Sequence, residues 1–164
     1  MDVGRLNDQT VCCVFRVNIT NDGKYHATLV NLYVLGRQSQ TKTFSQQAIE
    51  LKKIIRAFNP REVVIDTNGL GIGFADEMIR EQIDEFGNTY EPLGFHNDDE
   101  FVKIQPKDAP RLLYGLKANG PLNSKIHGNA YTRLNGGLVR FLIKDQEAKS
   151  ALLATKMGQK MSVV

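Results

Sequence analysis

The apolar and polar positions of the first third of the chain predict strands joined by a turn. Residues 9–19 and 26–35 are rich in β-branched and aromatic side chains, which favour strands. Asn21-Asp22-Gly23 between them is a hairpin signal, because glycine tolerates a positive φ. Asp2-Val3 has the pattern of the tail of a further strand. We therefore predict an antiparallel meander at the start of the chain.

Helical spacing begins after this meander. Apolar residues recur every three or four positions over residues 44–58, Thr43 and Gln46 match a capping box, and Asn59-Pro60 ends the pattern. The β-branched run of residues 63–65 then predicts a short buried strand that ends at Asp66.

The second half of the chain gives weaker signals. We predict a helix over 72–86, a short strand over 90–95, a loop over 96–107 and a helical turn over 111–117. A further helix begins at Gly120-Pro121, with proline at its first position. Its predicted apolar face consists of Leu122, Ile126, Ala130 and Leu134. Residues 138–143 are expected to be extended, and Asp145 is a plausible N-cap of a last helix.

This order of elements predicts the fold class α/β. An antiparallel meander followed by alternating helices and strands is typical of a mixed β-sheet, with parallel strands added to the meander and helices packed on it. A chain of 164 residues is long enough for one domain, spanning 1–164, with a sizeable core. No apolar run approaches the length of a membrane span, so no membrane partner is expected.

Charge is unevenly distributed along the chain. Residues 1–100 contain 10 Lys and Arg against 15 Asp and Glu, whereas residues 101–164 contain 11 against 3. A basic second half suggests a polyanionic partner such as double-stranded DNA, held through its backbone without sequence reading. The candidate DNA-binding residues are Lys103, Lys107, Arg111, Lys125 and Arg133. The alternative is a solvated lysine-rich surface.

Two carboxylates, Asp2 and Asp66, stand at predicted strand ends. Ligands of α/β sheets bind outside the carboxyl ends of strands, and two close carboxylates repel each other unless a cation or a proton intervenes. Oxygen ligands suit Mg²⁺ or Mn²⁺, and two such ions can hydrolyse a phosphodiester. Asp2 and Asp66 are therefore the candidate catalytic and metal-binding residues. The alternative is that each merely caps a turn.

Three glycines, Gly69, Gly71 and Gly73, follow Asp66. Their spacing departs from the dinucleotide-binding fingerprint, which needs Gly-x-Gly-x-x-Gly directly after the strand. They either keep the space above Asp66 open for a bulky ligand or allow a tight turn from strand to helix.

Several segments together resemble the nuclease domain of tailed-bacteriophage terminase large subunits, a member of the RNase H-like superfamily. The segments are 2–10, 63–71, 122–131 and 136–141. The resemblance implies an endonuclease that cuts concatemeric double-stranded DNA through two divalent ions, Mg²⁺ or Mn²⁺, held by Asp2 and Asp66. It also implies a third acidic ligand late in the domain, which has no clear match here; Asp145 is the single late candidate.

The resemblance further implies where and with what the domain works. The expected partners are the terminase ATPase domain, the small terminase subunit and the portal protein. The expected location is the cytoplasm of the infected bacterial host, transiently at the procapsid portal. Because a catalytic Asp rarely comes second in a natural chain, we expect the sequence to be an excised C-terminal fragment of a larger packaging protein. The competing hypotheses are a non-catalytic DNA- or portal-docking module with the same fold, and a nucleotide-binding domain that uses the glycine turn.

Overall fold

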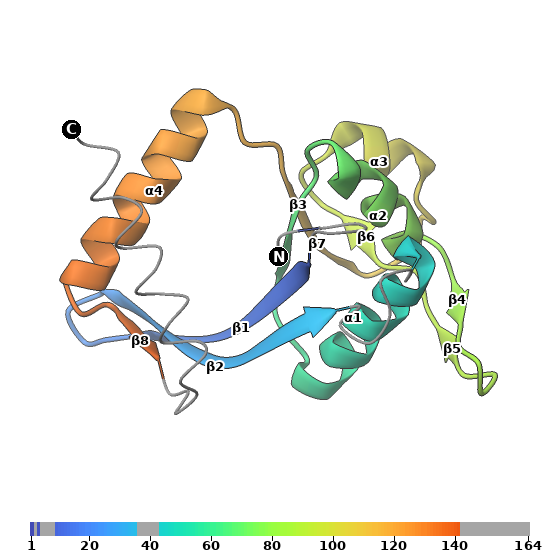
Figure 1. The fold of residues 1–164 in the computed structure, drawn as a ribbon, viewed down its shortest axis with the longest axis horizontal. Helices are drawn as coiled ribbons and strands as arrows, with labels where there is room; N and C mark the ends of the chain where they lie inside the picture. Colours follow the sequence, from blue (N-terminus) through green and yellow to red (C-terminus); the bar gives the residue numbers. More distant parts are fainter. Residues whose placement is uncertain (2, 4–8, 36–42, 142–164) are drawn as a thin grey trace. The chain divides into compact units, whose positions relative to one another are not determined.

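The computed structural model describes residues 1, 3, 9–35 and 43–141 (Figure 1). In chain order the elements are β1 (Thr10–Ile19), β2 (Tyr25–Leu35), α1 (Phe44–Phe58), β3 (Val63–Asp66), α2 (Leu70–Met78), β4 (Gln82–Ile83), β5 (Thr89–Tyr90), β6 (Gly94–Phe95), α3 (Asp99–Ile104), β7 (Arg111–Leu116), α4 (Gly120–Asn135) and β8 (Val139–Phe141). The chain divides into two compact units. The first contains Met1–Cys13 and Leu32–Asn129, and the second contains Val14–Asn31 and Ala130–Val164.

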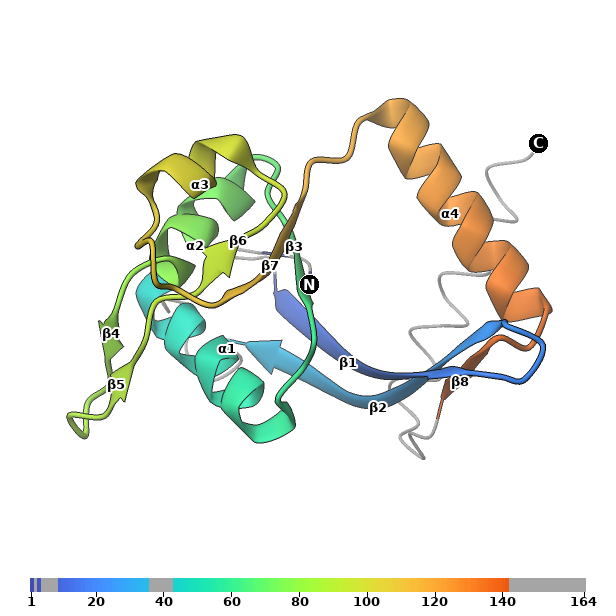
Figure 2. The ribbon, with the colours of Figure 1, turned by 180° about the vertical axis from the view of Figure 1, so that it is seen from behind.

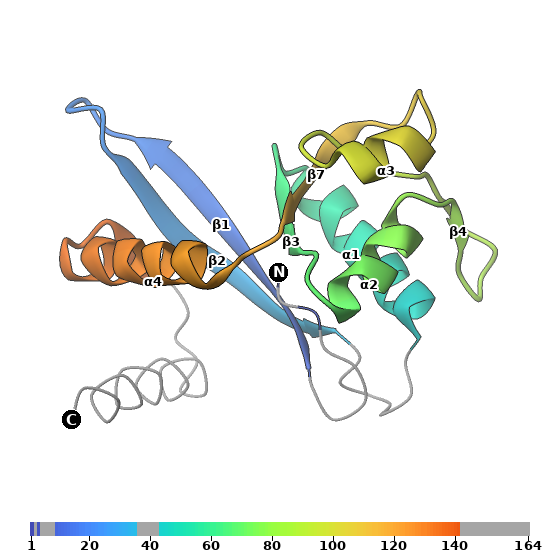
Figure 3. The ribbon, with the colours of Figure 1, turned by 90° about the horizontal axis from the view of Figure 1, so that it is seen from above.

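Strands β1 and β2 form the predicted hairpin, a long two-stranded ribbon (Figure 3). At its turn the Thr20 nitrogen donates to the Lys24 carbonyl at 2.9 Å, and Gly23 has φ +74°, the left-handed conformation that the turn signal predicted. Strand β8 joins β2 in parallel, with Ala27 opposite Val139. This sheet therefore combines antiparallel and parallel pairing, as the predicted fold class requires.

The first unit contains a second sheet, of order β3-β7-β6, whose pairs are all parallel. The prediction of a helical turn over 111–117 is wrong, because β7 is the central strand of this sheet. Leu113 and Gly115 are buried, and the residues between and around them are less so, which is the period-2 pattern of a strand. The glycine and the adjacent Leu112-Leu113 pair conceal that period in the sequence.

Helices α1 and α2 pack with this sheet in the core of the first unit (Figure 1). Ile65, Leu113, Phe74 and Met78 are completely buried, and Leu51 of α1 is 1% exposed. The start of α1 is the predicted capping box: Thr43 Oγ1 accepts from the Gln46 nitrogen, and Gln46 Oε1 accepts from the Thr43 nitrogen. The strong local signals of α1 and β3 thus confirm the predicted elements.

Helix α2 ends at Met78, so the prediction of a helix over 72–86 is wrong in its second half. The chain there forms the β4–β5 hairpin, which lies beside α1 (Figure 2). The physical reason is Asp84, whose carboxylate accepts from the backbone nitrogens of Phe86 and Asn88. Such local side-chain bonds offer the backbone an alternative to the helix.

The predicted loop over 96–107 contains helix α3, and that prediction is also wrong. Asp98 caps this helix by accepting from the Glu100 nitrogen, and Phe101 stacks on Phe95 with ring centroids 4.6 Å apart. The predicted strand over 90–95 is divided between the ends of β5 and β6.

Helix α4 has the predicted bounds, but its predicted apolar face is not buried: Ala130 is exposed, and Leu122, Ile126 and Leu134 are only half-buried. The extended segment predicted over 138–143 is confirmed for β8. The helix predicted from Asp145 lies outside the described residues. No helix in the described part of the chain is long and apolar enough to cross a membrane.

Candidate active site

Asp66 is the last residue of β3, at the carboxyl end of the parallel sheet. It lies opposite Leu116, the last residue of β7. Ile65 before it is completely buried, whereas Asp66 is half-buried. Successive side chains of a strand point to opposite faces. The buried Ile65 therefore fixes the strand in the core, and the Asp66 side chain lies on the face that also bears the exposed Val64.

In the described part of the chain the Asp66 carboxylate accepts one hydrogen bond, from the Asn68 nitrogen to its Oδ1 at 2.9 Å. Asn68 in turn donates from Nδ2 to the Ala118 carbonyl at 3.0 Å. The turn after β3 is thereby tied to the segment that leads into α4. Among the described residues Asp66 Oδ2 has no partner, which leaves oxygen lone pairs for a ligand that is a cation or a donor.

The glycines after Asp66 are explained by a tight turn. Gly69 has φ +52°, and a Cβ atom at Gly71 would lie 1.9 Å from the Asp66 carbonyl oxygen. Gly73 is less restricted, since its Cβ would meet the Phe44 ring at 3.1 Å. The first turn of α2 therefore approaches the backbone of Asp66 so closely that only glycine fits at Gly71.

Met1 pairs with the same strand. Its nitrogen donates to the Val64 carbonyl at 2.7 Å, and its carbonyl accepts from the Asp66 nitrogen at 3.1 Å. These two bonds are the pattern of a parallel pair in which Met1 stands opposite Ile65. Asp2, the other candidate metal ligand, lies outside the described residues, as does Asp145.

The candidate DNA-binding residues belong to different elements. Lys103 belongs to α3 and Lys107 follows it, whereas Lys125 and Arg133 belong to α4; all four are exposed. Arg111 begins β7, so it lies at the opposite end of the sheet from Asp66, and its Nη1 donates to the Phe95 carbonyl at 3.1 Å.

A hydrogen-bonded cluster beside the end of β7 was missed by the sequence analysis. The Asn97 side chain donates to the Gly115 carbonyl at 2.8 Å and accepts from the Gly115 nitrogen at 2.7 Å, so it extends the sheet where β6 stops. Lys117 Nζ lies 3.0 Å from Asp98 Oδ2 and 3.3 Å from Glu100 Oε2. With Leu122, residues 97–100 and 114–117 line a cavity of about 430 Å³.

The ion pairs of this cluster shift the titration of its members. Burial acts to raise the pKa of Asp98, but the hydrogen bonds from Lys117 and from the Glu100 nitrogen outweigh it and lower that pKa. The hydrogen bonds to Asp98 and Glu100 raise the pKa of Lys117. The incorrect predictions of a helical turn over 111–117 and a loop over 96–107 concealed this pairing. The one available signal in the sequence was the acidic run 98–100.

Among the described residues no group of three or more His, Cys, Asp or Glu side chains is arranged to hold a metal ion. The donor chemistry of Asp66 nevertheless fits Mg²⁺ or Mn²⁺, because these ions prefer carboxylate oxygens and keep several water ligands. Asp66 thus provides one ligand of a candidate cation site.

The described residues form an α/β fold with one sheet of mixed pairing and a second, all-parallel sheet on which α1 and α2 pack and at whose edge Asp66 ends a strand, which is the fold class that RNase H-like domains share. Comparison with protein families agrees: the family model of the terminase RNaseH-like domain matches residues 1–98. The chain therefore belongs to the terminase RNaseH-like domain family, and the resemblance deduced from the sequence is confirmed. No curated protein and no solved structure matches the chain.

Proposed function

We propose that this domain is a divalent-metal-dependent endonuclease that hydrolyses phosphodiester bonds of concatemeric double-stranded DNA during viral genome packaging. The observation that carries this proposal is the half-buried Asp66 carboxylate, which ends a parallel strand with one oxygen unpartnered among the described residues. Membership of the terminase RNaseH-like domain family supports the substrate class.

The second ligand in this proposal is Asp2. Met1 pairs with Ile65, and Asp2 and Asp66 are the next residues of the two paired segments. The family resemblance supports Asp2 as the second ligand. Two carboxylates that share a site repel each other unless a cation or a proton intervenes.

The chain's own residues would position the substrate and hold the ions. When bound, two Mg²⁺ or Mn²⁺ ions would activate water and stabilise the leaving oxygen of the phosphodiester. Gly71 and Asn68 fix the turn that orients Asp66, and exposed basic residues supply contacts to the DNA backbone. As partners we propose the terminase ATPase domain, the small terminase and the portal, in the cytoplasm of an infected bacterium.

The test is cleavage of supercoiled plasmid in Mn²⁺ by the parent chain and by Asp66→Ala. We expect a loss of more than roughly 100-fold, because even outer partners of a metal ligand are worth 10–100-fold in metal affinity or activity. Calorimetric titration with Mn²⁺ should show weaker binding as well. The matched control is Asp108→Ala, an exposed carboxylate that precedes the amino end of β7 and should cut like the parent.

Undiminished cutting by Asp66→Ala would remove Asp66 from the mechanism. A parent chain that binds DNA in a salt-sensitive manner but cuts with neither Mg²⁺ nor Mn²⁺ would favour the competing hypothesis, a docking module that retains only the fold.

A further inference from the structure

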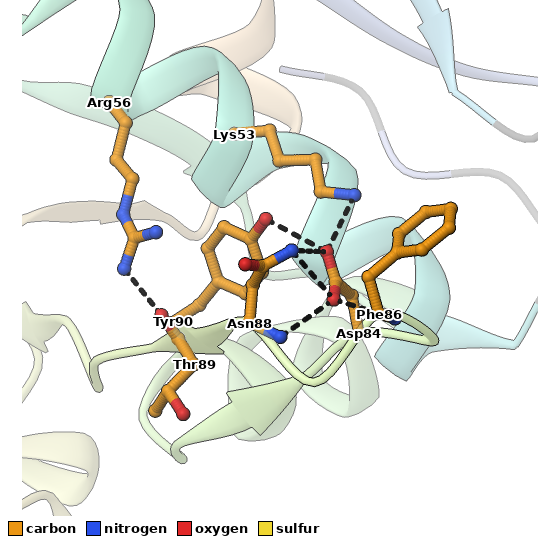
Figure 4. A network of polar contacts seen from close by, with 7 residues as sticks. All are labelled: Lys53, Arg56, Asp84, Phe86, Asn88, Thr89 and Tyr90. Atoms are coloured by element: carbon orange, nitrogen blue, oxygen red, sulfur yellow. Dashed lines mark hydrogen bonds and ion pairs between the residues drawn. The ribbon is translucent and has the colours of Figure 1, made fainter.

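The β4–β5 hairpin is fastened to the core helix α1 by two cations (Figure 4). Lys53 Nζ lies 3.1 Å from Asp84 Oδ2, just after the first strand of the hairpin. Arg56 Nη2 donates to the Thr89 carbonyl at 2.5 Å, and its guanidinium lies over the Tyr90 ring, 4.3 Å from the ring centroid. Because both cations belong to α1, they fix the position of the hairpin on the first unit.

The turn of this hairpin is also ordered by its own hydrogen bonds. The Asp84 carboxylate accepts from the nitrogens of Phe86 and Asn88, at 3.0 and 2.9 Å. The Gly87 nitrogen donates to the Asp84 carbonyl at 2.9 Å, and Gly87 has φ +80°. The turn therefore uses the backbone nitrogen of Phe86 but does not need an aromatic side chain at that position.

Two large apolar side chains of this ordered hairpin face water. Phe86 is 78% exposed, more than any other large apolar residue that the structure describes, and Ile83 is 61% exposed. Ile83 lies on the face of the hairpin opposite the buried Gln82. Three peptide units separate Ile83 from Phe86, so their Cα atoms are at most about 11 Å apart. Single exposed apolar residues are ordinary, but two that a rigid turn holds this close have the character of an anchor for a partner.

The hairpin carries charge of one sign. Residues 81–91 contain four Asp or Glu and no Lys or Arg. Glu81, Glu85 and Glu91 are exposed, and no ion pair within the described part of the chain includes them. The fourth acid, Asp84, is the one that Lys53 neutralises. The exposed apolar residues are therefore flanked by carboxylates that are available to a basic partner.

Charge selects the partner of this surface. An acidic surface repels DNA and other polyanions and attracts a basic one. We propose that the hairpin docks on another protein, with Phe86 inserted into an apolar pocket and with Glu81 and Glu85 paired with Lys or Arg side chains on the pocket rim. Because the turn is already ordered, little conformational entropy is lost when the partner binds. This inference goes beyond the proposed nuclease activity and does not use Asp66.

The experiment uses a model peptide with the chemistry expected of the partner. A fluorescein-labelled peptide of about 18 Leu and Lys residues, ordered to form an amphipathic helix, presents an apolar face with a basic rim. Its dissociation constant for the 164-residue chain is obtained from anisotropy. A second peptide has the same composition in an order that gives no apolar face. We expect the amphipathic peptide to bind about tenfold more tightly or better, because only its apolar face can bury Phe86.

A pair of variants locates the apolar contact. Phe86→Ser should weaken binding of the amphipathic peptide about tenfold or more, because the buried aromatic area is lost. It should leave the Tm unchanged, because the ring is mostly exposed in the folded chain. Ile104→Ser is the matched control: Ile104 is 65% exposed on α3, and this variant should bind like the parent.

A second pair of variants tests the charge of the hairpin. Glu85→Lys replaces an attraction for the basic peptide by a repulsion next to Phe86, and we expect binding to be weaker by roughly fivefold or more. Asp108→Lys changes the net charge of the chain by the same amount at another exposed site, so its effect should be smaller. The difference between the two variants should shrink at high salt, since exposed charges are screened. Equal effects of the two variants would overturn the assignment of the acidic rim.

Three results would overturn the proposal: parent-like affinity of Phe86→Ser, equal losses for Phe86→Ser and Ile104→Ser, or equal affinity of the parent for the two peptides. A marked fall in the Tm of Phe86→Ser would also overturn it, by showing that the ring serves the fold. Self-association of the parent chain that Phe86→Ser abolishes, with peptide binding unchanged, would assign the surface to a second copy and count against a different protein. These readouts do not depend on plasmid cleavage by Asp66→Ala, so failure of this inference and failure of the nuclease proposal are distinguishable.

Discussion

Two aspartates of the first unit lie in similar local sequences but in contrasting hydrogen-bonding environments. Asp66 lies in Ile-Asp-Thr-Asn-Gly and Asp84 lies in Ile-Asp-Glu-Phe-Gly, each at the end of a short strand or just beyond it. The Asp84 side chain is only 5% exposed and accepts from five donor groups (Figure 4). They are the nitrogens of Phe86 and Asn88, the Asn88 amide, the Tyr90 hydroxyl and Lys53 Nζ.

Among the described residues Asp66 accepts one hydrogen bond, from the Asn68 nitrogen. This difference in the number of donors indicates that Asp84 has a structural role and that Asp66 is available to a ligand. A carboxylate has about four lone-pair sites, so the donors around Asp84 use its capacity fully. That residue fastens the β4–β5 hairpin to α1 through Lys53. Asp66 keeps oxygen lone pairs available at a sheet edge where ligands of α/β folds bind. For this reason we assign the catalytic role to Asp66.

The largest effect on stability is expected from Gly71→Ala, which tests whether the backbone holds Asp66 in place. The added Cβ would lie 1.9 Å from the Asp66 carbonyl oxygen, so the helix start or the strand end must move. We expect a loss of about 2–4 kcal/mol in the free energy of unfolding and a more than tenfold loss of plasmid cleavage. Chemical denaturation and the cleavage assay provide the two measurements.

Gly73→Ala is the matched control on the same helix, because its Cβ would meet only the Phe44 ring, at 3.1 Å, and a side chain can shift. It should lose less stability than Gly71→Ala and keep cleavage. Equal behaviour of the two variants would mean that the close approach at Gly71 does not position Asp66.

Local signals in the sequence were sufficient to predict part of the fold and the position of Asp66. The turn at Gly23, the capping box at Thr43 and the β-branched run before Asp66 each depend on residues close in the chain, and the structure confirms the elements they predicted. The position of Asp66 at a sheet edge followed from the rule that strands of α/β sheets present ligands at their carboxyl ends.

The remaining features depend on residues distant in the chain. Strand β7 is a strand because it lies between β3 and β6, and Arg111-Leu-Leu-Tyr-Gly-Leu116 alone does not reveal that. The Asp98–Lys117 pair depends on that same strand. The contrast between Asp66 and Asp84 also depends partly on distant residues: the Phe86 and Asn88 donors to Asp84 lie in the turn after it, but the Tyr90 hydroxyl comes from β5 and Lys53 comes from α1.

Asp84→Ala should have an intermediate effect, confined to stability. It leaves the Tyr90 hydroxyl and the turn nitrogens without their acceptor, and it frees Lys53. We expect the Tm to fall by roughly 5 °C or more in scanning calorimetry. At temperatures well below that Tm, plasmid cleavage should equal that of the parent. Reduced cleavage by a fully folded Asp84→Ala chain would contradict the assignment of Asp84 to a structural role and of Asp66 to the catalytic role.

The smallest expected effect is the pH dependence of the contribution that Asp84 makes to the stability of the fold. Burial acts to raise the pKa of Asp84, but the hydrogen bonds from Asn88, Lys53 and Tyr90 outweigh it and hold that pKa well below its usual range. In the unfolded chain the pKa of an aspartate is about 3.9. The folded protein therefore binds fewer protons than the unfolded chain below about pH 4, and the stabilisation is lost as the pH falls from there toward the folded pKa.

The Tm difference between the parent and Asp84→Asn should be constant from pH 7 to about pH 5 and shrink below about pH 4. Lys53→Met, which removes one of the donors, should reduce that pH dependence only in part. A Tm difference that stays the same down to pH 3 would show that the charge of Asp84 does not fasten the hairpin.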